Sequence, residues 1–323
     1  MSHNELLAML SLAGMFGLFC FGFPIAYTML FAGLLFGFLG IGKLVFYLLT
    51  VQFYQVMSDT VQVAIPFFLV MGYLLEGAGL MERLFSAFQK LFARLPGSLY
   101  MAVISTGTIF AAATGIVGSS VNLLCVMAEP TMRKGGYDIR MGAGSIAASG
   151  TLGILIPPSI MLVILGPIVG VPVTDLFISA VIPGLLLASL YIGYSLIKCA
   201  IWPKYGPPLP PELRSHSLAE VLKELLVGAI PLLVLIFSVL GSIMFGIASP
   251  TEASACGAFA AIVMVIAYGK FSLKALAKAL YSTAKMSAMI LIMIASCNFF
   301  GAVFSRLGGA TFISNQLLSM HLS

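Results

Sequence analysis

Charged residues are scarce in this sequence: Asp, Glu, Lys and Arg together make up 8% of the 323 residues, against 60% hydrophobic residues. A soluble domain is usually about a quarter charged, so the composition excludes a soluble enzyme and a disordered chain. The net charge of +5 is too small and too scattered for a nucleic-acid-binding surface, which excludes a nucleic-acid partner. The composition predicts an integral membrane protein.

Residues of catalytic and metal-binding chemistry are also rare. No HExxH motif is present, and the three aspartates Asp59, Asp138 and Asp175 stand at the ends of apolar stretches. An intramembrane enzyme is therefore not expected. The cysteines form no CxxC pair, and we expect them to be small core residues rather than disulfides or metal ligands. They are Cys20, Cys125, Cys199, Cys256 and Cys297.

Long stretches without charged residues indicate the membrane spans, since a helix needs about 20 apolar residues to cross the hydrocarbon core. The first stretch is interrupted at Gly22-Phe23-Pro24 and predicts two spans. We expect about eight crossings and one segment that does not cross. The charge-free stretches are 6–42, 95–128, 141–174, 176–197, 225–251, 253–269 and 286–305, and a further apolar segment, 60–81, contains Glu76 near its end.

Segment 95–128 is too long for one span and slightly short for two. Basic residues flank it at 83–94 and at 133–140, and the positive-inside rule places both flanks in the cytoplasm. A chain that leaves and returns on one side must turn within the membrane. We predict a re-entrant helical hairpin over 98–130 with its tip near Gly115–Gly118. Two short ordinary helices with a small-residue packing motif are the alternative.

A second irregularity is predicted within 138–168, where Gly150, Gly153 and the pair Pro157-Pro158 interrupt an apolar run. The prolines remove two backbone donors, and Pro157 disfavours helical geometry at Ile156. We predict a membrane helix that unwinds and restarts, which frees carbonyl groups for a cation and directs a helix N-terminus into the membrane. A proline kink that only shapes packing is the alternative.

The distribution of basic residues predicts the orientation of the chain. The N-terminus is expected outside the cytoplasm and Asp175 at the outer face. A proline-rich loop between Lys198 and Lys223 is expected in the cytoplasm.

Two segments, 81–95 and 270–285, are amphipathic, and we expect both to lie in the cytoplasmic interface in contact with membrane lipid. The acidic residues near the membrane receive structural interpretations. Glu252 is expected to cap a helix start, and Glu76 and Glu129 are expected at the interface.

A weak internal repeat is detectable at an offset of about 226 residues, where Gly22-Phe23-Pro24 aligns with Ala248-Ser249-Pro250. Inverted repeats are common in secondary transporters. A counterpart of the hairpin would begin just beyond Ser323. We predict an all-α polytopic membrane protein with an inverted-repeat, ion-transporter-like fold and an incomplete second repeat. The expected parts are scaffold helices with an interfacial helix (1–97), half of a transport domain (98–170), a span with the cytoplasmic loop (171–224) and the opening of the second repeat (225–323, with spans 225–247, 253–269 and 286–305 and the interfacial helix 270–285).

Three motifs resemble the large membrane subunit of tripartite ATP-independent periplasmic (TRAP) transporters: Gly118-Ser119-Ser120-Val121, residues 132–138 and residues 147–159. The resemblance extends over essentially the whole chain, with supporting matches at 64–68, 182–186 and 248–253. Full members of that family continue further and contain a second hairpin and a second Pro-Pro break. This sequence lacks both.

The resemblance implies the permease component of a sodium-coupled, binding-protein-dependent secondary transporter. Such a protein lies in the bacterial inner membrane and imports small organic acids, dicarboxylates among them, by an elevator-type movement. The implied partners are a periplasmic substrate-binding protein and a small four-helix membrane subunit. Na⁺ is the implied coupling ion, and no cofactor or other metal is expected.

By position, the resemblance places sodium between the hairpin tip and the helix break, and the substrate between the same elements. Sodium is a hard cation suited to carbonyl, hydroxyl and amide oxygens. The serines and Asn122 could instead satisfy hairpin backbone or helix–helix hydrogen bonds. The candidate sodium-binding residues are Gly115, Gly118, Ser119, Ser120, Asn122, Ser149, Gly150, Gly153 and Pro157, and the candidate substrate-binding residues are Ser119, Ser120, Thr151 and Ser159.

Two other functions fit the same sequence. The chain could form a channel-like pore built on the re-entrant loop. Alternatively, it could be a truncated fragment of a transporter that does not itself transport. A requirement for a sodium gradient separates a transporter from a channel.

Overall fold

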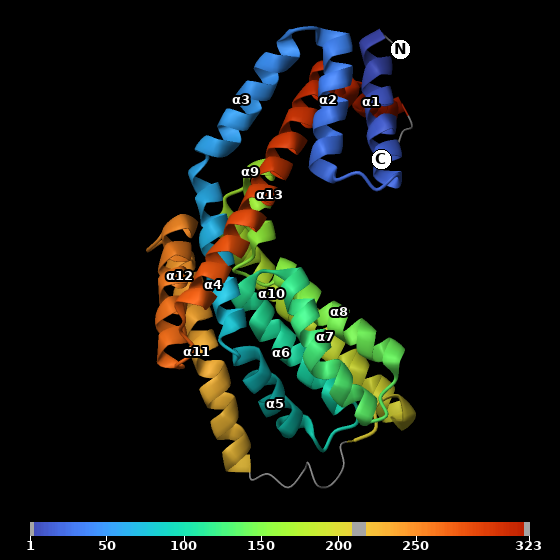
Figure 1. Ribbon diagram of the computed structural model, residues 1–323. Coiled ribbons are helices and arrows are strands. Elements are labelled where there is room, and N and C mark those ends of the chain that lie inside the picture. Colours follow the sequence, from blue (N-terminus) through green and yellow to red (C-terminus); the bar gives the residue numbers. More distant parts are fainter. Residues whose placement is uncertain (1–2, 209–217, 320–323) are drawn as a thin grey trace. The chain divides into compact units, whose positions relative to one another are not determined.

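The computed structural model describes residues 3–208 and 218–319, and the regular structure within these ranges is helical (Figure 1). Six of the described helices are long and apolar enough to cross a membrane, or seven if one bent pair is counted as a single span. The prediction of an all-α polytopic membrane protein is therefore confirmed. The helices are α1 His3–Cys20, α2 Ile25–Ile41, α3 Leu44–Ser58, α4 Ala64–Gly77, α5 Leu80–Phe92, α6 Ser98–Thr114, α7 Val117–Lys134, α8 Ile139–Leu155, α9 Ile160–Val169, α10 Val173–Ile201, α11 Leu218–Met244, α12 Pro250–Ala267, α13 Leu273–Arg306 and α14 Gly309–Ser319, with short 3₁₀ turns at Thr60–Val63 and Pro203–Tyr205.

Helix boundaries coincide with residues that break or cap helices. α1 ends before Gly22, which has a φ of +80°, and α2 begins after Pro24. At the start of α12, the Ser249 hydroxyl accepts a hydrogen bond from the Glu252 N–H, and the Glu252 carboxylate accepts one from the Ser249 N–H. This capping box satisfies backbone donors that lack partners at a helix start. The structural role predicted for Glu252 is confirmed.

The described chain forms two compact units. The first contains the N-terminal residues up to Gln62 and the C-terminal residues from Lys285. In its core, glycines of α2 face large apolar side chains of α13 and of Leu307 directly after it, so the two helices approach closely. The pairs are Gly33 with Phe299, Gly37 with Val303 and Gly40 with Leu307, and a Cβ at each glycine would come within 3.0 Å of its partner.

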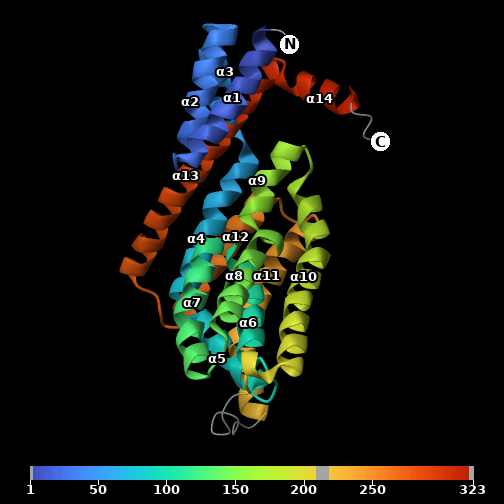
Figure 2. The ribbon, with the colours of Figure 1, turned by 90° about the vertical axis from the view of Figure 1, so that its right-hand side faces the viewer.

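The second unit, Val63–Ala284, contains both irregular segments predicted above. α8 packs against α6, α7 and α10, and Figure 2 shows these helices side by side. α12 packs on α4, and α11 packs on α5. The hairpin and the broken helix therefore belong to one packed body.

Element lengths and packing agree with the 226-residue offset. α2 runs from 25 to 41, and α12, its expected counterpart, runs from 250 to 267. In the second unit, Gly257 of α12 faces Met71 of α4, as Gly33 of α2 faces Phe299 of α13 in the first unit. Each unit thus pairs a glycine-bearing helix with a helix that carries large apolar residues.

The C-terminal region differs from expectation. An interfacial helix over 270–285 and a separate span over 286–305 were predicted, and the structure has one 34-residue helix, α13. The prediction depended on the lysines in the first segment. No glycine or proline lies between Leu273 and Phe300, so nothing in the backbone chemistry ends the helix.

The other amphipathic segment forms α5, as predicted, but protein covers its apolar face. Its buried residues lie against α6 and α11, and Lys90 Nζ contacts a Glu224 carboxylate oxygen of α11 at 2.6 Å. The apolar stripe of α5 is therefore a packing surface. The buried residues are Leu80, Met81, Leu84, Phe85, Ala87 and Phe88.

The cysteine prediction was largely wrong. All five thiols are free, but Cys199 alone of the five is buried, whereas Cys20, Cys125 and Cys256 are exposed. An apolar sequence context indicates a core only when the surface is polar, and here many large apolar residues are exposed. Part of the predicted proline-rich loop, residues 209–217, lies outside the described residues.

Candidate functional site

The two arms of the predicted hairpin, α6 and α7, are joined by Gly115 and Ile116. Their outer ends meet: the Ser98 hydroxyl lies 3.0 Å from the Tyr137 hydroxyl, and the Leu99 N–H donates to the same Tyr137 oxygen. The Tyr100 and Tyr137 rings also pack edge to face, 5.0 Å apart. The chain therefore enters and leaves the hairpin at one end, and its re-entry within the membrane stays a prediction.

The hairpin tip is closed by short-range hydrogen bonds. Gly115 ends α6 in the left-handed conformation, with a φ of +62°, which glycine adopts without strain. The Thr114 hydroxyl donates to the Phe110 carbonyl, and it lies 3.3 Å from the Ser120 hydroxyl. Ser120 donates to the Ile116 carbonyl at 2.8 Å. Two buried hydroxyl groups thus converge at the turn.

The predicted helix break is present between α8 and α9, whose axes differ by 48°. Residues 156–159 are non-helical and buried, and the Pro157–Pro158 peptide bond is cis. The Ser159 hydroxyl donates to the Ile154 carbonyl at 2.6 Å and so satisfies one acceptor at the end of α8. The sequence prediction of an unwound segment at the proline pair is confirmed.

The hairpin tip lies directly against this break. A Cβ at Gly115 would stand 3.2 Å from the Pro158 carbonyl oxygen and 3.3 Å from the Ile160 nitrogen. On another side, Gly72 of α4 approaches the Thr114 carbonyl: a Cβ there would be 2.9 Å from that oxygen. Glycine is needed at both positions because backbone approaches backbone. The structure thus brings together the two irregular segments that the sequence placed about 40 residues apart.

Four helix ends therefore meet in one place: the C-termini of α6 and α8 and the N-termini of α7 and α9. Neither N-terminus has a side-chain cap, at Ile116 or at Ser159. Helix C-termini carry partial negative charge and favour cations, and uncapped N-termini present N–H groups to anions. The junction combines both properties with neutral hydroxyl and carbonyl oxygens.

Several candidate residues serve packing in the structure. Ser149 is fully buried, donates to the Ile146 carbonyl and faces Gly107 of α6. Gly150 lies under Val121 of α7, and Gly153 lies against Ala111 of α6. The small residues at these positions allow α8 to pack closely against both hairpin arms. The pairs by which α8 approaches them are Gly107 with Ser149, Gly150 with Val121 and Gly153 with Ala111.

Three other candidates are exposed rather than buried at the junction. Gly118, Asn122 and Thr151 are exposed, and the Thr151 hydroxyl donates to the Ala148 carbonyl of its own helix. The residues that the structure does bring together are Gly115, Ser120, Pro157 and Ser159.

Glu76 is a residue of this region that sequence reasoning placed elsewhere. Its carboxylate, half-buried near the end of α4, accepts a hydrogen bond from the Ser119 hydroxyl. Glu76 was expected at the membrane interface, which stays a prediction, and the structure adds that its carboxylate contacts Ser119 on the first turn of α7. The sequence did hold a signal for this contact, namely the four-residue spacing between Gly72 and Glu76. Residues four apart lie on the same face of a helix. Because Gly72 contacts the hairpin tip, Glu76 also faces the hairpin.

Comparison with known proteins gives the family. Residues 12–323 match the family model described as tripartite ATP-independent periplasmic transporter, DctM component. The chain is 32% identical over 256 residues to the C4-dicarboxylate TRAP transporter large permease protein DctM of Pseudomonas aeruginosa, covering 79% of this chain and 58% of that protein. It is 27% identical over 299 residues to the sialic acid TRAP transporter large permease protein SiaM of Vibrio cholerae, covering 92% and 68%.

A third relative is the isethionate TRAP transporter permease protein DctMQ of Oleidesulfovibrio alaskensis, which is 28% identical over 258 residues, or 80% of this chain and 40% of that protein. The chain spans about three fifths of the length of the C4-dicarboxylate permeases that it matches. The family match extends over nearly all of this chain, including the hairpin and the helix break. The chain therefore belongs to the DctM family, the large permease subunits of TRAP transporters.

Proposed function

We propose that this chain is the membrane permease component of a sodium-coupled, binding-protein-dependent transporter that imports small organic acids by an elevator-type mechanism. The observation that carries the proposal is the junction of the hairpin tip with the helix break. Unwound backbone and opposed helix ends within a membrane protein are typical of ion and substrate sites in secondary transporters.

The sodium part of the proposal depends on the oxygens at the junction. The Thr114 and Ser120 hydroxyls, 3.3 Å apart, and the Ile116 and Pro158 carbonyls lie around the glycine turn. Such a neutral oxygen set suits a hard monovalent cation. Ser120 and Gly115 belong to the site expected from the sequence, and we add Thr114 to the proposed site because its hydroxyl lies beside that of Ser120.

The substrate part depends on the two uncapped helix N-termini. They direct N–H groups of α7 and α9 toward the junction, which favours carboxylate or sulfonate groups. The names of the relatives support an acid: C4-dicarboxylate, sialic acid and isethionate. We propose a periplasmic binding protein and a small membrane subunit as partners, and the DctMQ name of one relative supports the latter.

The elevator mechanism depends on how the second unit is packed. The hairpin, the broken helix and α10 lie in one compact unit, which supports their movement as a body. A bacterial inner-membrane location with a periplasmic N-terminus is part of the same proposal.

The proposal is tested by the thermal stability of the purified chain in detergent at equal concentrations of NaCl, KCl and choline chloride. A ligand present at 100 times its Kd stabilises a protein by about 2.7 kcal/mol, so we expect Na⁺ alone to raise the Tm by several degrees. Adding succinate, a probe dicarboxylate, to the sodium form is expected to raise it further.

Ser120→Ala is expected to abolish the sodium-specific shift, because it removes a hydroxyl from the turn. Ser189→Ala is the matched control: the Ser189 hydroxyl also donates to a carbonyl four residues earlier, Leu185, on the exposed side of α10. Equal Tm values in the three salts, or an unchanged sodium shift in Ser120→Ala, would contradict the proposed site.

A further inference from the structure

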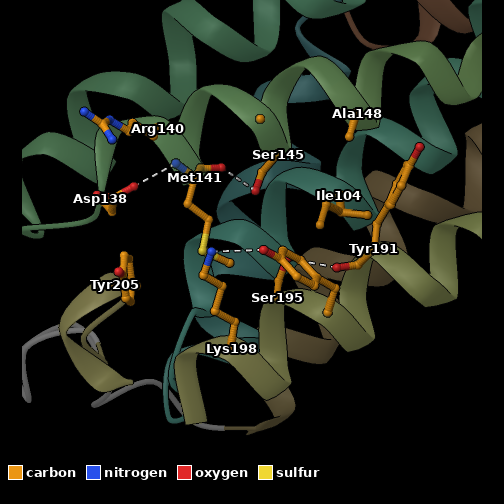
Figure 3. A pocket seen from close by; sticks show the side chains of 12 residues that line it. Ile104, Asp138, Arg140, Met141, Ser145, Ala148, Tyr191, Ser195, Lys198 and Tyr205 are labelled. Carbon is orange, nitrogen blue, oxygen red and sulfur yellow. Dashed lines mark hydrogen bonds between the residues drawn. The ribbon is translucent and has the colours of Figure 1, made fainter. Parts of the chain in front are cut away.

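A separate cavity of about 690 Å³ opens between α8 and α10, away from the hairpin tip (Figure 3). It lies beside the start of α8 and the end of α10, where the chain carries basic residues. Its polar lining includes Arg140 and Ser145 of α8 and Tyr191, Ser195 and Lys198 of α10, with Tyr205 from the following 3₁₀ turn. None of these residues belongs to the proposed transport site.

Lys198 is held in a defined position within this cavity. Its Nζ donates to the Tyr194 hydroxyl at 2.9 Å and lies 5.3 Å from the Tyr194 ring centre and 5.1 Å from that of Tyr205. Cation–π contacts of this kind orient an ammonium group without neutralising it. No described carboxylate forms an ion pair with Lys198. A fixed ammonium with free hydrogen-bonding capacity therefore faces the cavity.

The other charges at the cavity favour an anion. Arg140, on the first turn of α8, flanks the opposite rim with an exposed side chain (Figure 3). The one carboxylate in the lining, Asp138, accepts a hydrogen bond from the Met141 N–H at 2.9 Å and caps α8. The lining thus has two cations against one carboxylate, which leaves a net positive charge.

An apolar groove of about 460 Å³ adjoins this cavity and shares Tyr194, Lys198 and Tyr205 with it. Its remaining lining is Ile197, Ile201 and Trp202. These three side chains are 58%, 59% and 51% exposed. Trp beside Lys at the end of an apolar helix is typical of the membrane–water interface.

We propose that this cavity and groove together bind one anionic phospholipid. The phosphate lies between Lys198 and Arg140, and an acyl chain follows the groove beside Ile197 and Ile201. A free phosphate or carboxylate would use the cations but not the groove, and a zwitterionic lipid would use the groove but gain less from the cations. Basic pockets between membrane helices are suited to acidic lipid headgroups.

The test is native mass spectrometry of the detergent-solubilised chain with equimolar phosphatidylglycerol and phosphatidylcholine. We expect preferential binding of phosphatidylglycerol. One basic residue near an acidic headgroup changes affinity by roughly fivefold, so Lys198→Gln and Arg140→Gln are each expected to weaken phosphatidylglycerol binding by about that factor. Lys198→Arg retains the charge and is expected to keep the preference, which separates charge loss from misfolding.

Lys134→Gln is the matched control, because Lys134 is an exposed basic residue at the end of α7 that lines neither cavity. Its lipid binding is expected to equal that of the unmodified chain. Ile201→Ser is expected to weaken phosphatidylglycerol binding, and glycerol phosphate at the same concentration is expected not to displace the lipid. Equal binding of the two lipids, full retention in the Lys198→Gln/Arg140→Gln double variant, or displacement by glycerol phosphate would overturn the proposal.

Discussion

At the scale of single residues, the contact of Glu76 with Ser119 connects α4 to the hairpin. The Ser119 hydroxyl donates to the carboxylate across 43 positions of sequence, and both side chains are half-buried. Hydrogen bonds to charged groups contribute about 1.5–3 kcal/mol, and partial exposure reduces this. The contact therefore fixes the first turn of α7, next to the proposed ion site.

We expect a double-mutant cycle of Glu76→Ala and Ser119→Ala to give a coupling energy of about 1–2 kcal/mol toward unfolding. The measurement is the free energy of unfolding of the four proteins in mixed micelles. Ser119→Ala combined with Glu82→Ala is the control, since Glu82 is exposed on α5, and its coupling is expected to be near zero. Additive effects of the first pair would show that the contact does not stabilise the hairpin.

Residue identity alone did not distinguish ligand from packing roles. Ser120 and Ser149 are both buried serines in glycine-rich segments, and both donate to carbonyls of their own helix region. Ser120 lies at the turn beside a second hydroxyl, whereas Ser149 faces Gly107 between two continuous helices. The two serines therefore differ in their tertiary surroundings and not in residue type or local hydrogen bonding.

At the scale of elements, α8 occupies a slot between the hairpin arms that only small side chains allow. A Cβ at Gly150 would stand 2.1 Å from Val121 Cγ2, far inside a normal contact. Overpacking of this kind costs about 1–3 kcal/mol. The glycines of this segment are thus needed for close helix packing, besides any role in unwinding the helix.

Gly150→Ala is therefore expected to lower the free energy of unfolding by about 1–3 kcal/mol, measured by thermal unfolding in detergent. Gly144→Ala, on the same helix with nothing within 4 Å of the added Cβ, is expected to be neutral or slightly stabilising. Val121→Ala is expected to rescue Gly150→Ala in part, because it removes the methyl group that clashes. A stable Gly150→Ala protein without rescue would argue against the slot.

The amphipathic elements show a related limit of pattern reading. The apolar stripe was predicted over 81–95, and the part of it that is buried in α5 lies against α6 and α11. A hydrophobic stripe indicates that one face of a helix is shielded from water. Either lipid or protein can shield it, so the stripe does not identify which of the two covers the helix. The continuous α13 shows the same point, since charge spacing does not end a helix without a backbone reason.

At the scale of the whole molecule, the orientation predicted from the basic residues is open to direct measurement. We expect Val171→Cys, between α9 and α10, to react with a membrane-impermeant maleimide in intact spheroplasts. Lys134→Cys, at the end of α7, is expected to react only after lysis, because its flank is basic and belongs inside. Both are made in a background without the exposed thiols Cys20, Cys125 and Cys256.

Labelling of Lys134→Cys in intact spheroplasts would show that the chain has the opposite orientation to the predicted one. Reaction of both positions from the same side would show that the chain does not cross the membrane between them. The broken helix would then not be a membrane span. The buried Cys199 is the internal control, since it is expected to stay unreactive in both preparations.

The sequence by itself determined the membrane class, several helix boundaries and the two irregular segments, because these depend on hydropathy and on the local backbone chemistry of glycine and proline. Gly115 and the Pro157-Pro158 pair act on their immediate neighbours, and no distant residue is needed to predict a turn or a break there. The family resemblance also followed from contiguous motifs. Tertiary structure alone decided that the tip rests on the break, that Glu76 reaches Ser119, and that Ser149 and Gly150 seat a helix. These contacts join residues far apart in the chain, and hydropathy assigns a face to a helix without naming the neighbour that covers it.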